Sequence, residues 1–284
     1  MSDIKKLIGD TKQWVEQEKV WDDALYATGA ASNEQRAMSE QQKTIQSVNS
    51  LPIAHSSLRS SDKDIALKSL YEKYKNCVRC PLGPTRIKFV FGVGNANSEV
   101  LFIGEGPGYE EDRRGEPFVG KSGQLLDKMM AAIGLSRRTN AYIANIVKCH
   151  PMVNPQTPEA RGNDRPPAPE EVATCSPILL QQIAIMKPRV IMTLGSPSTK
   201  MILHTRDAIT GLRGKIVAFD VDYFYSLISE IEELKIDGET REALRNTKVV
   251  PTYHPAALLR NPNLKPESWT DLKLLRDLLG KSGA

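Results

Sequence analysis

The chain has 284 residues, of which 40% are hydrophobic and 25% charged, a composition typical of globular proteins with a sizeable core. Its 38 lysines and arginines against 34 aspartates and glutamates give a net charge of +4, which neither requires nor excludes a polyanionic partner. No secretory h-region follows the first residues, and nowhere do about 18 apolar residues run together. We therefore expect a cytoplasmic protein without a membrane partner. Four cysteines are too few for a disulfide scaffold in a chain of this length.

The first 62 residues are predicted to lie outside the globular domain. Residues 4–25 carry apolar side chains at helical spacing among charges, which predicts one short amphipathic helix. Residues 27–62 are rich in Ser, Gln, Asn and Ala, which is typical of a linker that cannot bury enough apolar surface to fold. The helix could pack on the domain or dock a protein partner, and both interpretations stay open.

From residue 64 onward, strand-like and helix-like segments alternate, which predicts an α/β sandwich with a largely parallel sheet over residues 63–284. Four short apolar runs are typical of buried strands, namely residues 100–103, 141–147, 190–194 and 248–253. Helices are expected at 123–133, 169–186 and 267–280. A Pro- and Asn-rich surface loop is expected at 152–168, and a helical insertion at 220–247.

All four predicted strands run into chemically unusual segments. These are Gly104-Glu-Gly-Pro-Gly108, Asn145-Ile-Val-Lys-Cys149, Gly195-Ser-Pro197 and His254-Pro255. Open parallel sheets bind ligands beyond the carboxyl ends of their strands. The four segments are therefore expected to converge on one cleft.

Every cysteine of the chain could belong to one metal site. Cys77 and Cys80 have the spacing of two ligands, and Cys149 and Cys175 follow 26 residues apart. Tetrahedral zinc and a 4Fe-4S cluster both accept four thiolates, so the spacing leaves the metal open. Four unrelated buried thiols are the alternative.

Two further segments are candidates for chemistry. The glycines of the 104–108 turn let backbone N–H groups approach a ligand, and the carboxylates of Glu105, Glu111 and their neighbours are close in sequence. The alternatives are a plain strand-to-helix turn and a solvated acidic face. The ring of Phe118 follows this turn and suits base stacking. His254 at a strand end could donate a hydrogen bond to a leaving group, although an ordinary structural histidine is the simpler interpretation.

Together these motifs resemble the family-4 uracil-DNA glycosylases over residues 66–283. The matching elements are Cys77-x-x-Cys80-Pro-Leu, Gly104-Glu-Gly-Pro-Gly108-x-x-Glu111-Asp112, Pro117-Phe-Val-Gly120, Asn145-x-x-Lys148-Cys149, Leu194-Gly195 and Tyr253-His-Pro-Ala256. The resemblance implies a three-layer α/β/α sandwich around a short four-stranded parallel sheet. It also implies a structural 4Fe-4S cluster held by Cys77, Cys80, Cys149 and Cys175.

The implied activity is hydrolysis of the N-glycosidic bond of a flipped uracil in single- or double-stranded DNA, which initiates base excision repair. The resemblance implies that Phe118 stacks on uracil and that the Asn145 amide forms hydrogen bonds with the edge of the base. It also implies that His254 donates a hydrogen bond to uracil O2 as the base departs. Glu105, with the backbone of Gly104, Gly106 and Gly108, holds or polarises the attacking water, and Glu111 helps line the pocket. Leu258, Leu259 and Arg260 fill the vacated base stack. A monomer associated with the nucleoid is expected.

Two other classes of function are weighed against this one. A non-catalytic iron-sulfur module of the same fold could bind DNA, but Glu105, Phe118, Asn145 and His254 are all present. A dinucleotide-binding redox protein would need an acidic residue at the end of the second strand, where this chain has Asn145. Basic residues near the predicted cleft are candidate phosphate contacts, namely Arg113, Arg114, Lys121, Lys148, Arg213, Lys215 and Arg260.

Overall fold

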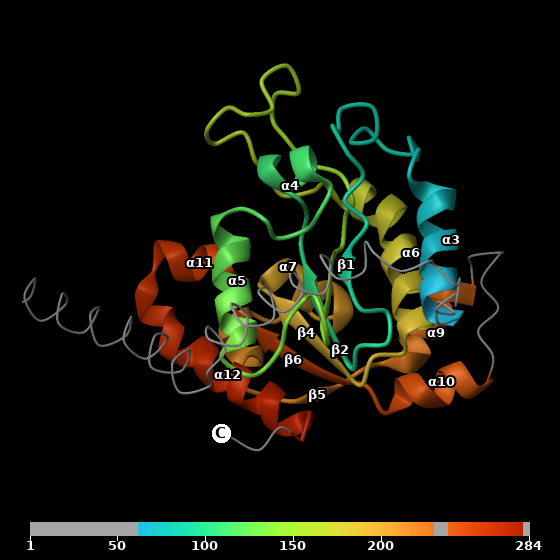
Figure 1. Cartoon of the computed structure of the whole chain (residues 1–284), viewed down its shortest axis with the longest axis vertical. Coiled ribbons are helices and arrows are strands. Elements are labelled where there is room, and N and C mark those ends of the chain that lie inside the picture. Colours follow the sequence, from blue (N-terminus) through green and yellow to red (C-terminus); the bar gives the residue numbers. More distant parts are fainter. Residues whose placement is uncertain (1–61, 230–237, 281–284) are drawn as a thin grey trace, which may run out of the picture.

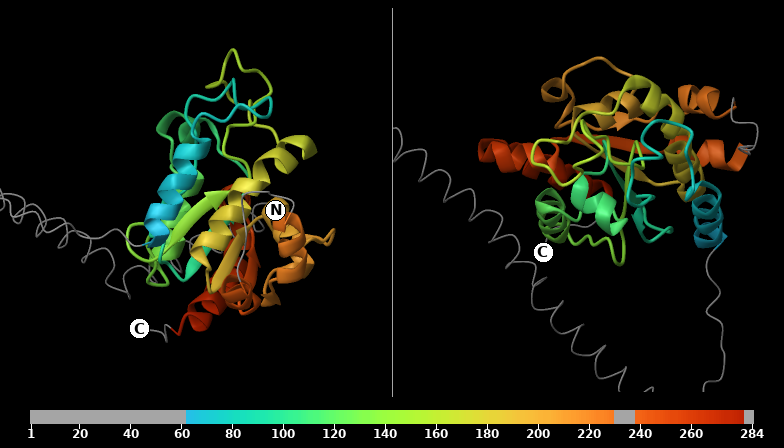
Figure 2. Two further views of the ribbon diagram at one scale, coloured as in Figure 1. Left: turned by 90° about the vertical axis from the view of Figure 1, so that its right-hand side faces the viewer. Right: turned by 90° about the horizontal axis from the view of Figure 1, so that it is seen from above.

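The computed structural model describes residues 62–229 and 238–280. The predicted helix at 4–25 and linker at 27–62 therefore lie outside the described residues, apart from Asp62, which begins helix α3 (Asp62–Tyr74). From there the chain forms a sheet with helices on both faces, as Figures 1 and 2 show. None of the described helices is long and apolar enough to cross a bilayer.

The sheet has six strands in the order β1-β3-β2-β4-β6-β5. The four inner strands are parallel and correspond to the four predicted runs: β2 (Val100–Gly104), β3 (Tyr142–Asn145), β4 (Val190–Leu194) and β6 (Lys248–Thr252). The expectation of a four-stranded sheet is corrected at the edges. There β1 (Val93–Gly94) and β5 (Val217–Ala218) add two-residue antiparallel strands.

Alternate residues of the inner strands face two separate hydrophobic clusters, so both faces of the sheet are buried. Leu101 and Ile103 face one cluster, which also receives α3, α6 (Pro169–Met186), α7 (Ser196–Ile202), α9 (Val221–Ser229) and α10 (Gly238–Arg245). Val100 and Phe102 face the other cluster, which receives α5 (Lys121–Ala131), α11 (Pro255–Arg260) and α12 (Lys265–Leu278). This is the three-layer α/β/α arrangement that the resemblance implied.

The predicted helices lie close to their expected positions. Helix α6 spans 169–186 as predicted, because Pro169 at its first position and the Glu171 carboxylate bound to the Ala168 N–H define its start. Helices α5 and α12 each begin and end two residues before the predicted bounds. The 220–247 insertion contains α9 and α10, and residues 230–237 between them lie outside the described residues.

Short elements surround the carboxyl edge of the parallel strands. Helix α4 (Tyr109–Arg114) follows β2, and α8 (Ile209–Leu212) and the 3-10 turn η1 (Pro262–Leu264) complete the described helices. Residues 152–168 lie outside helices and strands apart from a bridge between Met152 and Asp164, so the predicted long loop is confirmed. In Figure 1 this loop and α4 lie at the same end of the sheet.

Candidate functional site

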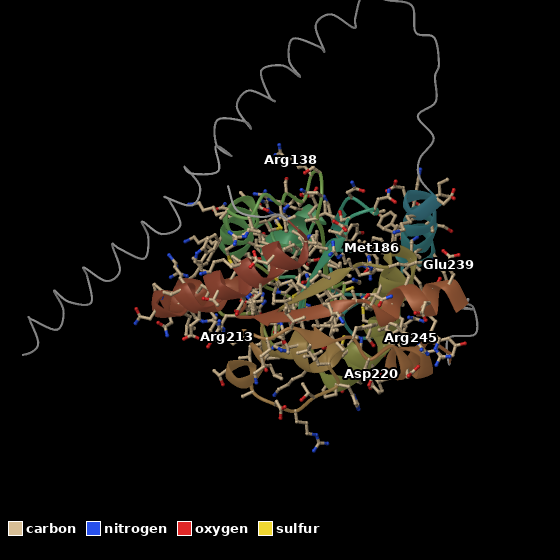
Figure 3. The ribbon with its side chains drawn as sticks, turned by 90° about the horizontal axis from the view of Figure 1, so that it is seen from below. Arg138, Met186, Arg213, Asp220, Glu239 and Arg245 are labelled. Carbon is tan, nitrogen blue, oxygen red and sulfur yellow. The ribbon has the colours of Figure 1, made fainter. Side chains whose placement is uncertain are left out.

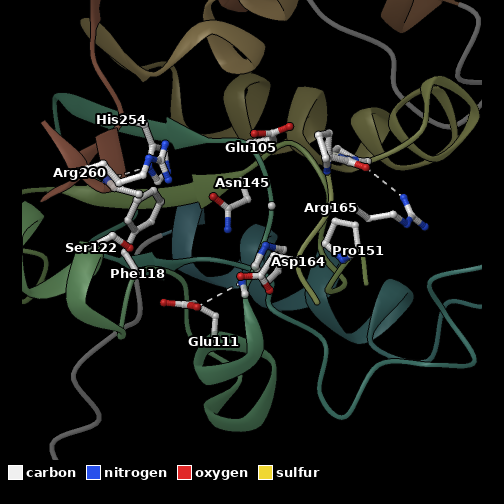
Figure 4. A pocket seen from close by; sticks show the side chains of 16 residues that line it. Glu105, Glu111, Phe118, Ser122, Asn145, Pro151, Asp164, Arg165, His254 and Arg260 are labelled. Carbon is white, nitrogen blue, oxygen red and sulfur yellow. Dashed lines mark hydrogen bonds between the residues drawn. The ribbon is translucent and has the colours of Figure 1, made fainter. Parts of the chain in front are cut away.

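A cavity of about 400 Å³ opens at the carboxyl ends of β2, β3 and β6. Three of the four expected segments line it, as Figure 4 shows, and they contribute Glu105, Asn145 and His254. The fourth segment, Gly195-Ser-Pro197, does not line the cavity. A Cβ placed on Gly195, which follows β4, would stand 3.0 Å from the His254 Cβ. The fourth segment therefore supports the histidine instead of lining the cavity.

Asn145 presents an unsatisfied polar atom to this cavity. Its side chain is 1% exposed, and its Oδ1 has no hydrogen-bond partner among the described residues. Gly104 lies opposite Asn145 in the β2–β3 register, and a Cβ there would overlap Oδ1 and stand 2.6 Å from the Phe118 ring. A buried amide oxygen without a partner costs free energy unless a ligand satisfies it. The site is therefore built to receive a hydrogen-bond donor.

Phe118 forms an apolar wall of the cavity. Its ring lies 5.4 Å from the His254 ring with an interplanar angle of 33°, and its side chain is 5% exposed. The backbone of Phe118 has a φ of 55°, a left-handed conformation that non-glycine residues rarely adopt. Such strain tends to persist where the surroundings hold a side chain in a required place.

His254 caps helix α11 and lines the cavity. Its Nδ1 accepts a hydrogen bond from the Ala256 N–H at 3.1 Å, so the proton of the neutral ring is on Nε2. Burial, together with the smaller effect of the positive charge of Arg260, lowers the pKa of His254 to about 4. At neutral pH the ring is thus an uncharged donor through Nε2.

The carboxylates after β2 have different roles. Burial raises the pKa of Glu105, which lines the cavity and makes no hydrogen bond to another described side chain. Glu111 also lines the cavity, but its carboxylate accepts from the N–H groups of Gly108, Val119 and Gly120 at 2.8 to 3.2 Å. Glu111 thereby connects the glycine turn to the Phe118 loop. Glu105, whose carboxylate has no such bonds, is the candidate for a catalytic role.

Asp112 acts similarly on the outer side of the turn. It is fully buried and accepts hydrogen bonds from the backbone N–H groups of Ile87 and Lys88 at 3.0 and 3.1 Å. The glycines of the turn allow close packing: a Cβ on Gly106 would meet Val147 at 2.8 Å, and Gly108 is the N-cap of α4. Two of the clustered carboxylates, those of Glu111 and Asp112, therefore stabilise the backbone around the turn.

One wall of the cavity comes from the end of the 152–168 loop, which was predicted from the sequence but not assigned to the site. The segment from Asp164 to Pro167 lines the cavity. The Asp164 carboxylate lies 2.7 Å from the Nε2 of the fully buried His150, and Arg165 makes two hydrogen bonds to Glu171 at 2.7 and 2.8 Å. Neither pair has a recognisable spacing, so no sequence signal could have placed this loop at the site.

Three residues assigned to DNA contacts have other positions. Leu258 is fully buried in the cluster with α5 and α12, so the expectation that it enters a base stack is wrong. Lys148 is fully buried, and its Nζ donates to the Asn145 carbonyl and to Gln182 at 2.7 Å. Arg213 is bound to Glu267 and Asp271. Arg260 is exposed and lines the cavity, and the neighbouring Leu259 is 47% exposed.

The four cysteines belong to one region of the core. Cys149 and Cys175 are buried in the α6-side cluster, and Cys77 and Cys80 pack against that cluster. Burial raises the pKa of Cys149 to about 12, and the nearby thiols of Cys175 and Cys80 act in the same direction. Within the part of the chain that the structure describes, no group of three Cys, His, Asp or Glu side chains is arranged to hold a metal ion.

The fold and the cavity define a class of proteins that bind a ligand beyond the strand ends of a three-layer α/β/α sandwich. The chain belongs to the uracil DNA glycosylase superfamily, since the family model described as "Uracil DNA glycosylase superfamily" matches residues 91–278.

Its relatives include three proteins named type-4 uracil-DNA glycosylase. That of Archaeoglobus fulgidus is 36% identical over 219 residues, covering 76% of this chain and 94% of the relative. That of Thermotoga maritima is 36% identical over 214 residues, covering 75% and 94%. That of Pyrobaculum aerophilum is 37% identical over 208 residues, covering 73% and 92%.

Proposed function

We propose that this protein is a type-4 uracil-DNA glycosylase, a hydrolase that removes uracil from DNA and leaves an abasic site for base excision repair. One observation carries the proposal: the buried Asn145 Oδ1 lacks a partner in a cavity that also contains Phe118 and His254. The N3–H of uracil is a donor that would satisfy this oxygen. Membership of the superfamily and the relatives' names support the same activity. We expect the protein to act in the cytoplasm, at the nucleoid.

In this proposal a uracil flipped from the DNA enters the cavity and stacks on Phe118 while Asn145 reads its edge. Negative charge builds on uracil O2 as the glycosidic bond breaks, and the Nε2–H of the neutral His254 donates to that oxygen. A donor placed where charge develops stabilises the transition state more than the ground state.

Water then captures the sugar carbon, and its proton needs an acceptor. Among the described residues, Glu105 is the cavity carboxylate without a side-chain partner, and its raised pKa makes it a better proton acceptor than an unperturbed glutamate. Glu111 positions the two loops through its three backbone hydrogen bonds. Leu259 and Arg260 are proposed to contact the DNA from which the base has left.

A 4Fe-4S cluster is the cofactor we propose for Cys77, Cys80, Cys149 and Cys175. Two observations support the proposal: the four cysteines belong to or pack against one hydrophobic cluster, and the Lys148 N–H donates to the Cys175 Sγ at 3.3 Å. Arg86 adds a positive charge 3.7 Å from the Cys149 Sγ. Backbone N–H groups and cations next to sulfur stabilise the net negative charge of such clusters. When bound, the cluster would supply structural support for the flanking loops.

Absorption spectroscopy and metal analysis of the purified protein test the cofactor. Broad absorption near about 400 nm with iron and acid-labile sulfide would support the cluster. A colourless protein containing zinc would contradict it. Cys175→Ser is expected to lower both the iron content and the melting temperature.

The activity is tested with labelled oligonucleotides that contain one uracil, unpaired or opposite guanine, followed by alkaline cleavage of abasic sites. Wild-type protein is expected to remove uracil from both substrates, and His254→Ala to reduce the single-turnover rate at least about 100-fold. His204→Ala is a matched control, since His204 is exposed and does not line the cavity. Folded, iron-loaded protein that leaves uracil in both oligonucleotides would favour a non-catalytic DNA-binding module.

A further inference from the structure

A second cavity, of about 590 Å³, lies between helix α3 and the β1 segment and is separate from the candidate active site. Its walls come from one face of α3, from residues 88–96 and from the end of α4. We refer to this cavity as the α3 groove.

Aromatic side chains form the floor of the α3 groove. The ring of Tyr71 lies 5.7 Å from that of Phe91 and 6.4 Å from that of Phe89. The two phenylalanines are 7% and 8% exposed, whereas Tyr71 is 37% exposed. The phenylalanines thus hold the tyrosine from behind and leave part of its ring open to a ligand. An exposed, supported aromatic ring is a platform on which a nucleic acid base can stack.

The rim of the groove is positively charged. Lys68, Lys75, Lys88 and Arg114 line it, against a single lining carboxylate, Asp64. Lys75 is paired with Glu72, and Arg114 lies 3.9 Å from Glu110. Lys68 and Lys88 make no side-chain ion pair with the described residues, and both are exposed. Two cations without acidic partners beside an aromatic floor complement a polyanion with bases.

Helix α4 links the α3 groove to the candidate active site. Gly108 and Glu111, at and near its start, line the active-site cavity, whereas Arg114 and Gly115, at its end, line the groove. The helix has six residues and is about 9 Å long. A DNA strand leaving the first cavity over this helix would reach the second within a few nucleotides.

We propose that the α3 groove binds single-stranded DNA that flanks the target nucleotide. Tyr71 stacks on one base of the strand. The phosphates of the strand contact the side chains of Lys68, Lys88 and Arg114. This inference rests on the proposed glycosylase function for its choice of ligand, because an acidic peptide would also suit the charge of the rim. The continuity through α4 favours DNA. The groove would make single-stranded substrates with long flanks bind more tightly than short ones.

Fluorescence anisotropy of the full chain with a uracil-free thymidine oligonucleotide of about 15 nucleotides is the direct test. The double variant Lys68→Glu/Lys88→Glu is expected to bind at least about 10-fold more weakly, and two lost phosphate contacts should lower the salt slope by about 1.4. Tyr71→Ala is expected to weaken binding without changing the salt slope. Lys128→Glu/Lys200→Glu is the matched control, with the same charge change at exposed positions outside both cavities.

Excision from a substrate of about three nucleotides, with the uracil in the middle and a single nucleotide on either side, is too short to fill both cavities and reports on the active site alone. Groove variants that excise normally from it but lose affinity for the longer strand support the proposal. Groove variants that bind the longer strand as the control does overturn it. Loss of binding to an acidic, aromatic peptide with DNA binding unchanged also overturns it, in favour of a peptide site. A wild type that binds through the groove but excises nothing would instead contradict the proposed glycosylase function.

Discussion

Arg137 fixes the strained backbone that carries the Phe118 ring. Its Nη1 and Nη2 donate to the carbonyls of Pro117 and Phe118 at 2.8 and 2.7 Å, and its Nε donates to Asp127 at 2.8 Å. On the inner side, a Cβ on Gly123 would overlap the Phe118 carbonyl. The left-handed Phe118 is therefore held by a planar fork on one side and by a glycine on the other.

Arg137→Lys should lower excision without unfolding the protein. A lysine cannot reproduce the fork to two consecutive carbonyls, so the Phe118 ring should lose its fixed position, and kcat/KM should fall about 10- to 100-fold, mainly through kcat. Single-turnover kinetics and the melting temperature are the measurements. Arg138→Lys is the control, because Arg138 projects away from the body of the protein, as Figure 3 shows. Equal effects of the two substitutions would refute the positioning role.

His254 should remain neutral across the physiological range. Its lowered pKa of about 4 means that the folded protein takes up this proton well below the usual histidine value of about 6.5. The unfolded chain is protonated first as the pH falls. The contribution of this residue to the free energy of unfolding therefore decreases as the pH falls from about 6.5 to about 4, and the loss persists at lower pH. Protonation of Nδ1 would also break its bond to the Ala256 N–H.

The ring nitrogens of His254 can be followed by NMR during a pH titration. Above about pH 5 we expect the pattern of a neutral ring with its proton on Nε2, with a midpoint near 4. His254→Gln should remove the titrating signal and identify it. A midpoint near about 6.5 would show that the ring is not desolvated as described.

At the scale of elements, the loop that forms one cavity wall is attached to α6 by a single ion pair. Arg165 binds both carboxylate oxygens of Glu171, whose pKa this pair lowers, and the Glu171 side chain is 3% exposed. Glu171 also accepts from the Ala168 N–H at the start of the helix. The same carboxylate therefore begins α6 and orients the Asp164–Pro167 wall.

Glu171→Gln should destabilise the protein by about 2 kcal/mol, because a charge-assisted pair becomes a neutral contact while Arg165 stays in place. KM for uracil-containing DNA should rise several-fold more than kcat falls, since the wall contributes to binding. Denaturant unfolding and steady-state kinetics check both effects. Glu170→Gln, at an exposed neighbouring position, is expected to change neither. A variant as stable as wild type would show that the pair does not anchor the loop.

Elements with a strong hydrophobic pattern could be predicted from the sequence, whereas those defined by tertiary contacts could not. The inner strands have five or fewer residues each, but they are buried on both faces and thus read as apolar runs. Strands β1 and β5 have two residues each and exist only because β3 and β6 offer edges for pairing. A segment of two residues is too short to show the alternation of apolar and polar side chains that indicates a strand, so these strands could not be predicted from the sequence.

The candidate site divides in the same way. Asn145 and His254 follow predicted strands, so the topology alone brings them to one edge of the sheet. Leu258 lies one helical turn after His254, and only the packing of α11 decides that it faces the core while Leu259 faces solvent. Asp164 reaches the cavity through a loop, whose path depends on His150 and Arg165 and not on any local pattern.

At the scale of the whole molecule, the residues from 62 onward contain everything that the proposed function uses. Both hydrophobic clusters, the four cysteines and the cavity lining, as far as the structure describes them, come from this part of the chain. Helix α3 begins at Asp62 and is joined to α6 by a hydrogen bond from Lys63 to the Met186 carbonyl at 2.6 Å. A core closed in this way is expected to fold without the residues that precede it.

The fragment 62–284 should therefore excise uracil with a kcat/KM within about 3-fold of the full chain and melt within about 3 °C of it. Excision of uracil from single-stranded oligonucleotides and thermal unfolding of both proteins are the measurements, and equal iron content is the control for intact folding. A folded, iron-loaded fragment with about 10-fold weaker excision would assign a part of catalysis or DNA binding to residues 1–61. A change in KM alone would place that part in binding, because an unchanged kcat leaves the chemical step intact.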